Sequence, residues 1–274
     1  MDDPFKAKTR PVTPWMGTNK EQWAADRLKF AEALLKTPTF VAKPLKKDFA
    51  HMLFCDESFF RVTDNRKVQW CRASQAPIAR EKHDWSASAH IWGCVGCNFK
   101  CLIDFSNQGT GPRGGITSED YIRLLNEHFV PKFNAHKARY PGTNFLLVQD
   151  GARIHTTDEC LEAIKSWGLN VFNKKPSKKE LKAKIAAGRQ VFWFWPAHSP
   201  DFNPIENLWF MMKRSTSKEC CWDLSASEAA KFALYKAIAK YWARLDMQKV
   251  TDLILSFPRR LLACVKAKGG ATGY

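Results

Sequence analysis

The order of strand-like and helix-like segments constrains the fold of this chain more than any other feature. Short apolar runs of strand length come first, and from about residue 118 such runs alternate with amphipathic helices. Antiparallel strands need only a turn between them, whereas parallel strands need a crossover, so hairpins followed by helices favour a mixed sheet. We therefore predict an α/β fold in which helices flank a mixed sheet.

The individual elements follow from periodicity, capping residues and breakers. Apolar runs between turn residues predict strands at 51–60, 67–71, 88–97, 99–105, 144–149 and 191–195. The first two of these strands form one predicted hairpin, and the next two form another. Apolar positions spaced three and four apart predict helices near 18–34, 118–133, 156–167, 204–213 and 225–244. Either Thr117 or Ser118 can cap the second helix.

The charge balance points to a polyanionic partner. The chain has 43 Lys and Arg residues against 27 Asp and Glu residues, a net charge of +16, and its 45% hydrophobic content is that of a folded protein. Phosphate backbones are the polyanions that an intracellular protein meets most often, so we expect nucleic acid as the partner. No apolar run is long enough to cross a membrane and no signal core begins the chain, so we expect no membrane contact and a soluble, intracellular protein.

The nine cysteines are expected to be reduced thiols, because a chain of this size needs no disulfide staples. Cys94, Cys97 and Cys101 form the tightest group, and with His90 they could complete a zinc site. The alternative, which we favour, is that these small thiols fill a sheet formed by two strands that meet at an Asn-containing turn.

Three acids stand at predicted element boundaries. Asp56 lies near the end of the first strand, Asp150 directly follows an apolar strand, and Glu206 stands in the first turn of a helix. Adjacent strands that end on one side of a sheet would bring Asp56 and Asp150 together, and a helix packed across those ends could add Glu206. Clustered carboxylates repel one another unless cations compensate them, so the pattern suggests a pair of Mg²⁺ or Mn²⁺ ions serving phosphoryl transfer.

Each acid also has an ordinary structural interpretation. Glu206 can complete a helix cap that Asn203 and Pro204 begin. Asp150 and Gly151 can form an ordinary turn after a strand. Asp56 can be a surface acid, or Glu57 can be the functional acid in its place.

The sequence around the acids resembles a known family. The resemblance rests on four segments: FCDESFF at 54–60, LLVQDGARIHTT at 146–157, WPAHSPDFNPIENLWFMMKR at 195–214 and FPRRLLACVKAKGGATGY at 257–274. These segments look like the catalytic domain of mariner-type DNA transposases of the DDE superfamily, and the likeness extends over most of residues 19–274. It implies a ribonuclease-H-like fold of the retroviral-integrase type with Asp56, Asp150 and Glu206 as the metal-binding, catalytic triad.

The resemblance also implies an activity and its partners. A protein of this family would cleave transposon ends and join them to target DNA with Mg²⁺ or Mn²⁺, using two ions. It would act as a homodimer, and in the nucleus if the host is eukaryotic or in the cytoplasm otherwise. Two alternatives are a domesticated or partial transposase that acts as a DNA-binding or assembly subunit, and a nuclease on the same fold.

This chain departs from the family pattern in several places. Gly151 and Arg153 stand where the family usually has Asn and Pro, and residues 151–205 make an unusually long connection between the second and third acids. No helix-turn-helix modules are expected before the first strand, and no linker motif is evident. We predict a linker or arm over 1–18, a DDE catalytic domain over 19–256 with a basic helical insert at 173–189, and a basic tail over 257–274.

Basic residues of the insert and the tail are candidate contacts for DNA phosphates. They are Lys174, Lys175, Lys178, Lys179 and Lys182 in the insert, and Arg259, Arg260, Lys266 and Lys268 in the tail. Solvated surface charge is the alternative for all of them. His155 and His198 could orient water, position a carboxylate or contact phosphate, although a place at a helix start and a brace for the proline-rich loop are their simpler roles.

Overall fold

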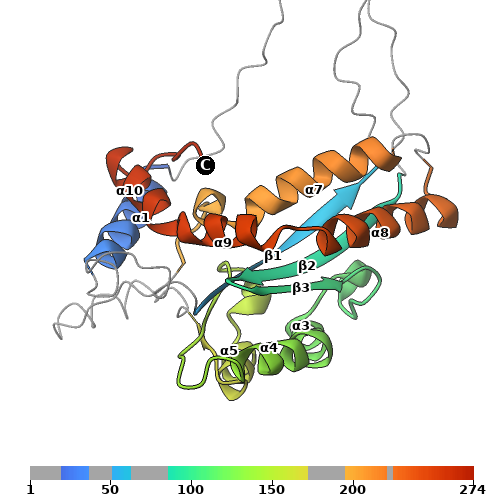
Figure 1. Cartoon of the computed structure of the whole chain (residues 1–274), viewed down its shortest axis with the longest axis horizontal. Coiled ribbons are helices and arrows are strands. Elements are labelled where there is room, and N and C mark those ends of the chain that lie inside the picture. Colours follow the sequence, from blue (N-terminus) through green and yellow to red (C-terminus); the bar gives the residue numbers. More distant parts are fainter. Residues whose placement is uncertain (1–19, 37–50, 63–85, 172–194, 221–224) are drawn as a thin grey trace, which may run out of the picture.

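A five-stranded mixed sheet runs through the middle of the molecule (Figure 1). The structure is a computed structural model of the chain and describes residues 20–36, 51–62, 86–171, 195–220 and 225–274. The strands are β1 (Met52–Arg61), β2 (Ser88–Gly96), β3 (Phe99–Asp104), β4 (Leu146–Val148) and β5 (Asn170–Val171). Their order across the sheet is β3-β2-β1-β4-β5. The first three strands are antiparallel and the last two run parallel to β1, which confirms the predicted mixed sheet.

The hairpin of β2 and β3 forms where the sequence predicts it. Asn98 takes a left-handed conformation with φ of 57° at the turn, a conformation that Asn adopts more readily than most residues. Cys94 pairs with Cys101 across the two strands, and both are buried in the sheet, as the thiol-packing interpretation predicts. The predicted partner of β1 at 67–71 lies outside the described residues; within them, β1 pairs with β2 and β4.

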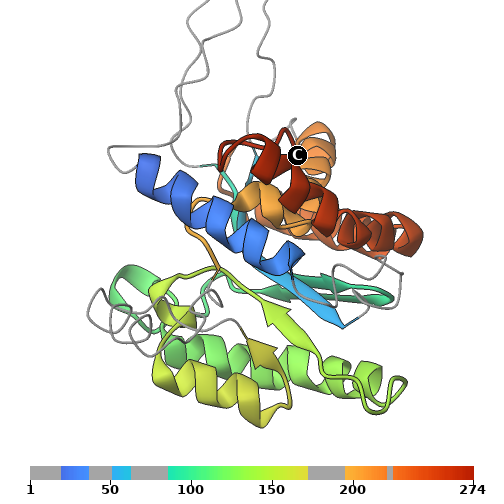
Figure 2. The ribbon, with the colours of Figure 1, turned by 90° about the vertical axis from the view of Figure 1, so that its left-hand side faces the viewer.

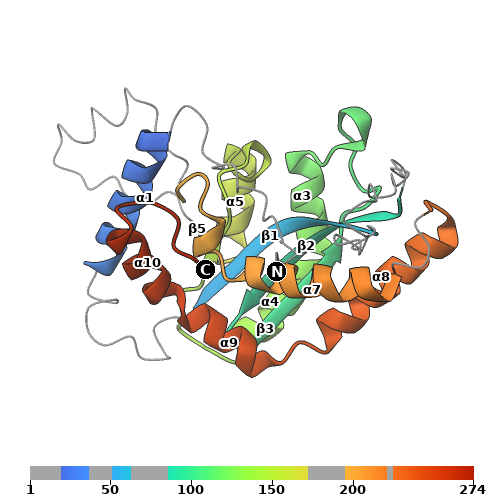
Figure 3. The same cartoon turned by 90° about the horizontal axis from the view of Figure 1, so that it is seen from above.

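Helices cover both faces of the sheet (Figures 2 and 3). They are α1 (Lys20–Leu35), α3 (Ser118–Leu124), η2 (Leu125–Phe129), α4 (Val130–Lys137), α5 (Asp158–Ser166), α7 (Ile205–Cys220), α8 (Glu228–Ala243), α9 (Met247–Leu255) and α10 (Phe257–Lys266). Helices α3 to α5 form one layer, and α1 with α7 to α10 form the other. Thr117 caps α3, its hydroxyl accepting from the Asp120 N–H, so the choice between Thr117 and Ser118 is settled.

The alternation of side chains along β1 divides the interior into two cores. Met52 and Phe54 face the layer of α1 and α7 to α10, whereas Leu53 and Cys55 face the layer of α3 to α5. All four side chains are buried. Because helices cover β1 on both faces, an acidic side chain on β1 can be partly buried on either face of the sheet.

The C-terminal segment belongs to the main core, which corrects the prediction of a separate basic tail over 257–274. The buried Phe257 ring packs edge-on against Phe54 at a centroid distance of 5.2 Å. Leu261 and Cys264 are buried in the same core. The predicted boundary after residue 256 therefore falls between α9 and α10, inside one folded unit.

Three other predictions fall on parts of the chain that the structure does not describe. They are the arm at 1–18, the basic insert at 173–189 and the strand at 191–195, of which only the last residue is described. In the described ranges, no helix is both long enough and apolar enough to span a bilayer.

Candidate active site

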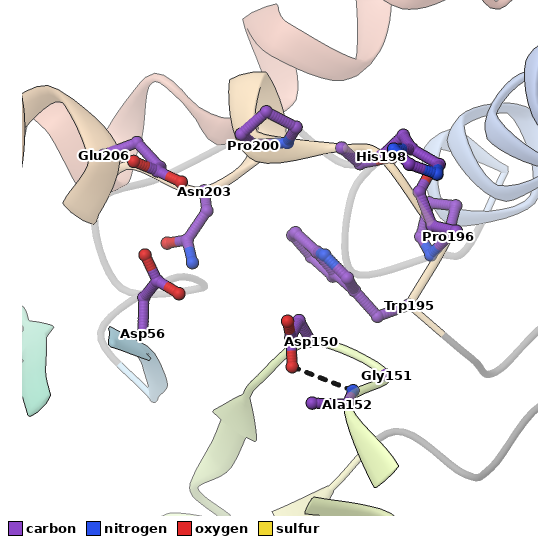
Figure 4. A pocket seen from close by; sticks show the side chains of 12 residues that line it. Asp56, Asp150, Gly151, Ala152, Trp195, Pro196, His198, Pro200, Asn203 and Glu206 are labelled. Carbon is purple, nitrogen blue, oxygen red and sulfur yellow. Dashed lines mark hydrogen bonds between the residues drawn. The ribbon is translucent and has the colours of Figure 1, made fainter. Parts of the chain in front are cut away.

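The three acids predicted from the sequence line one pocket (Figure 4). The pocket has a volume of about 490 Å³, and its walls come from the end of β4, the middle of β1 and the loop before α7. Trp195 and Asn203 lie among the acids in this view. Strand geometry and one helix start thus bring Asp56, Asp150 and Glu206 to one cavity.

Strand register explains how the first two acids meet. β1 and β4 are parallel neighbours, and Phe54 is in register with Val148. Asp56 and Asp150 each come two residues later, so they lie beside each other at the edge where β4 has ended. Asp150 also forms a turn, because its Oδ1 accepts from the N–H of Ala152 at 3.0 Å. The structural and the functional interpretation of this residue are therefore compatible.

Asn203 fixes the start of α7 to β1, next to the first acid. Its Nδ2 donates to the carbonyl oxygen of Cys55 at 3.1 Å, and its Oδ1 accepts from the N–H of Ile205 at 3.3 Å. Asn203 therefore provides the helix cap, and the side chain of Glu206 lines the pocket. The sequence identifies Asn203 as a cap but gives no signal for its bond to the neighbouring strand.

Two buried arginines hold the loop that precedes α7 and leads to Glu206. Arg27 on α1 donates through Nη1 and Nη2 to the two carboxylate oxygens of Asp201, both at 2.7 Å, and also through Nη1 to the carbonyl oxygen of His198 at 2.9 Å. Arg260 on α10 donates to the carbonyl oxygen of Asp201 at 2.8 Å and to Oδ1 of Asn207 at 2.6 Å. The loop is thus tied to both ends of the described chain.

Arg260 is consequently not the DNA contact that the sequence analysis proposed. Its side chain is buried, and its donors are used by the loop, by α7 and by Ser256 on its own helix. Arg259, Lys266 and Lys268 are exposed, so they remain candidates. The five lysines of the insert, Lys174, Lys175, Lys178, Lys179 and Lys182, lie outside the described residues.

The pocket concentrates negative charge around Asp56. Burial and then the charges of Glu206, Glu57 and Asp150 raise the pKa of Asp56 to about 8. Burial likewise raises the pKa of Glu206, although Lys213 opposes the change. An N–H donor partly compensates Asp56, since Nε1 of Trp209 lies 3.1 Å from its Oδ2. This part of the pocket therefore brings acidic side chains together with few protein groups that could neutralise them when they ionise.

Asp150 has a different electrostatic environment, because it shares His155 with Glu57. Nδ1 of His155 lies 2.7 Å from Oδ1 of Asp150, and Nε2 lies 3.1 Å from Oε1 of Glu57. Burial opposes the charge of His155, but the two carboxylates raise its pKa to about 10. Burial also opposes ionisation of Asp150, yet the hydrogen bond and charge of His155 lower its pKa overall. His155 lies just before the start of α5, as its simpler interpretation predicts, and its two contacts fit a residue that positions a carboxylate.

Glu57 is the functional candidate that sequence reasoning set aside. It follows Asp56 directly, so the strand turns its side chain to the opposite face. On that face Glu57 contacts His155, whereas Asp56 lines the pocket and Glu57 does not. The alternation of a strand could have indicated that Asp56 and Glu57 serve two different faces, but nothing in the sequence paired Glu57 with His155.

The chemistry of the donor set suits a hard divalent cation. Carboxylate oxygens are the ligands that Mg²⁺ and Mn²⁺ prefer, and a cation would relieve the repulsion that raises the pKa of Asp56. In the conformation that the structure describes, no three His, Cys, Asp or Glu side chains from the described ranges are grouped closely enough to hold an ion. The assignment of Asp56, Asp150 and Glu206 as metal ligands therefore stays a prediction.

Comparison with known proteins places the chain in a family of endonucleases and finds relatives among transposases. Residues 51–223 match the model of the DDE superfamily endonucleases. The Tcb1 transposase of Caenorhabditis briggsae is 27% identical over 240 residues, which cover 83% of this chain and 72% of the relative.

Solved structures agree in fold. A paired-end complex of the Mos1 mariner transposase with Mn matches with a TM-score of 0.68 at 14% identity, over 96% of this chain and 67% of that one. The isolated Mos1 catalytic domain matches with a TM-score of 0.59 at 14% identity, over 94% of this chain and 98% of that domain. These matches confirm the predicted ribonuclease-H-like fold.

Proposed function

The chain belongs to the DDE superfamily of endonucleases, and from this premise we propose that it is the catalytic domain of a DNA transposase related to the Tc1 and mariner proteins. The observation that carries the proposal is the convergence of Asp56, Asp150 and Glu206, from three separate elements, on one pocket. The reaction is cleavage of DNA at the transposon ends followed by joining of those ends to target DNA. Both steps are phosphoryl transfers that need no covalent protein intermediate.

Asp56, Asp150 and Glu206 are the residues that would hold Mg²⁺ or Mn²⁺, with two ions as the expected number. Divalent cations at such a site supply charge stabilisation to the phosphate in the transition state and make water or a 3′ hydroxyl a better nucleophile. Mos1 structures solved with Mn and with Mg support this choice of ions. The chain itself contributes the positions of the three carboxylates, which Asn203 and the strand register set.

Double-stranded DNA is the proposed substrate, bound mainly through its backbone. The net charge of +16 supports binding to phosphates, as do the exposed side chains of Arg259, Lys266 and Lys268. The lysine-rich insert at 173–189 adds further candidate contacts. We expect binding to fall steeply with salt and to show little preference for sequence.

We further propose that the active form is a homodimer and that the protein acts in the nucleus. Support for the dimer is a likeness to Mos1, which has been solved as a paired-end complex. Support for the nucleus comes from relatives in Caenorhabditis, since a eukaryotic host keeps its DNA there. Light scattering with and without a DNA end would test the dimer.

A joining assay tests the proposed activity. The purified chain is incubated with a pre-cut DNA end and a plasmid target in Mg²⁺, Mn²⁺ or EDTA, beside the variants D56N, D150N and E206Q. We expect joined product with either metal, none with EDTA, and none from the three variants. Cleavage without joining would instead indicate a nuclease, and DNA binding without either step would indicate a DNA-binding or assembly subunit.

A further inference from the structure

A buried network of hydrogen-bonded side chains lies next to the pocket. Its centre is His155, in the short helix η3 (Arg153–His155) that follows Asp150. His155 is only 2% exposed, yet both of its ring nitrogens lie within hydrogen-bonding distance of carboxylates. These carboxylates come from adjacent parallel strands, Glu57 from β1 and Asp150 from the residues after β4. His155 therefore bridges the two strands at the point where the pocket opens.

Other residues contact His155 besides the two carboxylates at its ring nitrogens. Tyr121 of α3 packs against it with ring centroids 4.6 Å apart. Nε2 of Gln149 donates to the carbonyl oxygen of His155 at 3.0 Å, and the Tyr121 hydroxyl donates to Oε1 of Gln149 at 3.1 Å. Nε1 of Trp92 in turn donates to the Tyr121 hydroxyl at 3.3 Å. Because these bonds hold the backbone of His155 and the Tyr121 ring packs against its imidazole, the ring has a defined position.

The hydrogen bonds of Asp150 are arranged unequally. Its Oδ1 accepts from His155 at 2.7 Å and from the Ala152 N–H at 3.0 Å, whereas Oδ2 takes part in neither bond. Two donors converging on one oxygen restrict rotation of the carboxylate. The side chain of Asp150 is half exposed, so without these donors it would be free to turn into solvent.

We propose that His155 and Glu57 are a positioning pair that holds the Asp150 carboxylate in the orientation required for binding a divalent cation. Glu57 acts through His155 by anchoring the far edge of the ring to β1, and neither residue is a cation ligand. The inference rests on the proposed function, since it takes Asp150 as a cation ligand. Partners that orient metal ligands typically change metal affinity by about 10- to 100-fold when they are removed.

Two substitutions at His155 separate its two contacts. The amide nitrogen of Asn stands near the place of Nδ1, so H155N can keep the donor to Asp150 and lose the link to Glu57. The amide nitrogen of Gln stands near the place of Nε2, so H155Q can keep the link to Glu57 and lose the donor to Asp150. A second pair of variants, E57Q and E57A, tests the anchor at a less buried site, and H128N is a control at an exposed histidine outside the pocket.

The test measures Mn²⁺ affinity by electron paramagnetic resonance, the unfolding midpoint in urea, and joining of a pre-cut DNA end. We expect H155Q to weaken Mn²⁺ binding by about 10-fold or more, and H155N by less than about 3-fold. E57A should weaken it more than E57Q, and H128N should leave it unchanged. Joining by H155Q should recover in part at high Mn²⁺ concentration.

Equal Mn²⁺ affinities for H155Q, H155N and wild type, with a lowered unfolding midpoint, would overturn the proposal and make His155 a packing residue only. Wild-type protein that binds no Mn²⁺ would overturn it as well. If wild-type protein binds Mn²⁺ but joins no DNA, the proposed function fails, while the order of affinities among the variants still decides the positioning pair. D56N is the control for the place of binding. It should lose Mn²⁺ affinity without changing the contacts of His155.

Discussion

The indole N–H of Trp209 donates to Oδ2 of Asp56 at 3.1 Å, and the ring that carries it packs directly over Gly93. Gly93 is the residue in register with Asp56 on the neighbouring strand β2. A Cβ at position 93 would lie only 2.8 Å from Cζ2 of Trp209. The absence of a side chain on β2 therefore lets α7 bring a hydrogen-bond donor to an acid on β1.

Replacing Gly93 by Ala should displace Trp209 and disturb Asp56. We expect G93A to lower the free energy of unfolding by about 1–3 kcal/mol, the usual cost of overpacking, and to reduce joining activity more than this loss explains. Urea unfolding and the joining assay measure the two effects. G115A is the matched control, because a Cβ at Gly115 meets only the Pro112 carbonyl oxygen at 3.4 Å and Gly115 does not line the acidic pocket. Full activity in G93A would show that the Trp209 contact is dispensable.

Asp56 should make the metal-free protein less stable as the pH rises. Its pKa is about 8 in the folded chain against an ordinary 3.8, so between these values the folded state keeps a proton that the unfolded state has lost. Stability therefore falls from about pH 4 to pH 8, and above pH 8 the folded protein carries the whole cost of the buried charge.

The variant D56N removes this charge. At pH 9 without metal we expect it to be more stable than wild type by on the order of a few kcal/mol, and the difference to vanish near pH 4. Urea titrations across this range measure it, with the exposed D252N of α9 as the control. Mg²⁺ should narrow the difference, because it would stabilise only the wild type. A difference that does not vary with pH would contradict the assignment of a raised pKa to Asp56.

The loop that leads to Glu206 should depend on the buried ion pair of Arg27 and Asp201. In R27M the carboxylate of Asp201 loses both of its bonds to the guanidinium, so we expect a loss of about 3–5 kcal/mol in unfolding free energy. The double variant R27M/D201N should recover part of this loss. K29M, at an exposed position of the same helix, should change stability by less than about 0.5 kcal/mol. A loss in R27M no larger than in K29M would mean that α1 does not support the loop.

The sequence predicts features that neighbouring residues determine, such as helix caps and turns. It does not predict contacts between segments that are distant along the chain. The cap at Thr117 and the turn at Asn98 follow from neighbouring residues, so the helix after Thr117 and the hairpin of β2 and β3 begin and turn where the sequence predicts. The pairing of β1 with β4 is not visible in either strand alone, although the resemblance places their acids in one site. The burial of Arg260 depends on a loop some sixty positions earlier in the chain, and no periodicity distinguishes it from the exposed Arg259.

The insert at 173–189 should contribute to DNA binding. Its seven Lys and Arg residues and one Glu are all within one short segment. We expect K178E/K179E/K182E to weaken DNA affinity and to give a shallower dependence of log affinity on log salt, because fewer counterions are released. Changing Lys29, Lys236 and Lys249 to Glu alters the net charge equally at exposed sites on helices and is the control. Equal effects of the two triple variants would show that only the overall charge matters.

The adjacent residues Arg259 and Arg260 should respond to the same substitution in opposite ways. Arg259 is exposed, so R259Q should leave the unfolding free energy within about 0.5 kcal/mol of wild type and reduce the magnitude of the salt slope of DNA binding by about 1 if the side chain contacts a phosphate. Arg260 is buried and donates to Asp201 and Asn207, so R260Q should cost about 3 kcal/mol or more in stability and leave the salt slope of the folded fraction unchanged. Urea unfolding and fluorescence anisotropy across a salt series measure both quantities on the same samples. A salt slope that changes in R260Q but not in R259Q would reverse the assignment, because it would require the buried guanidinium to reach DNA.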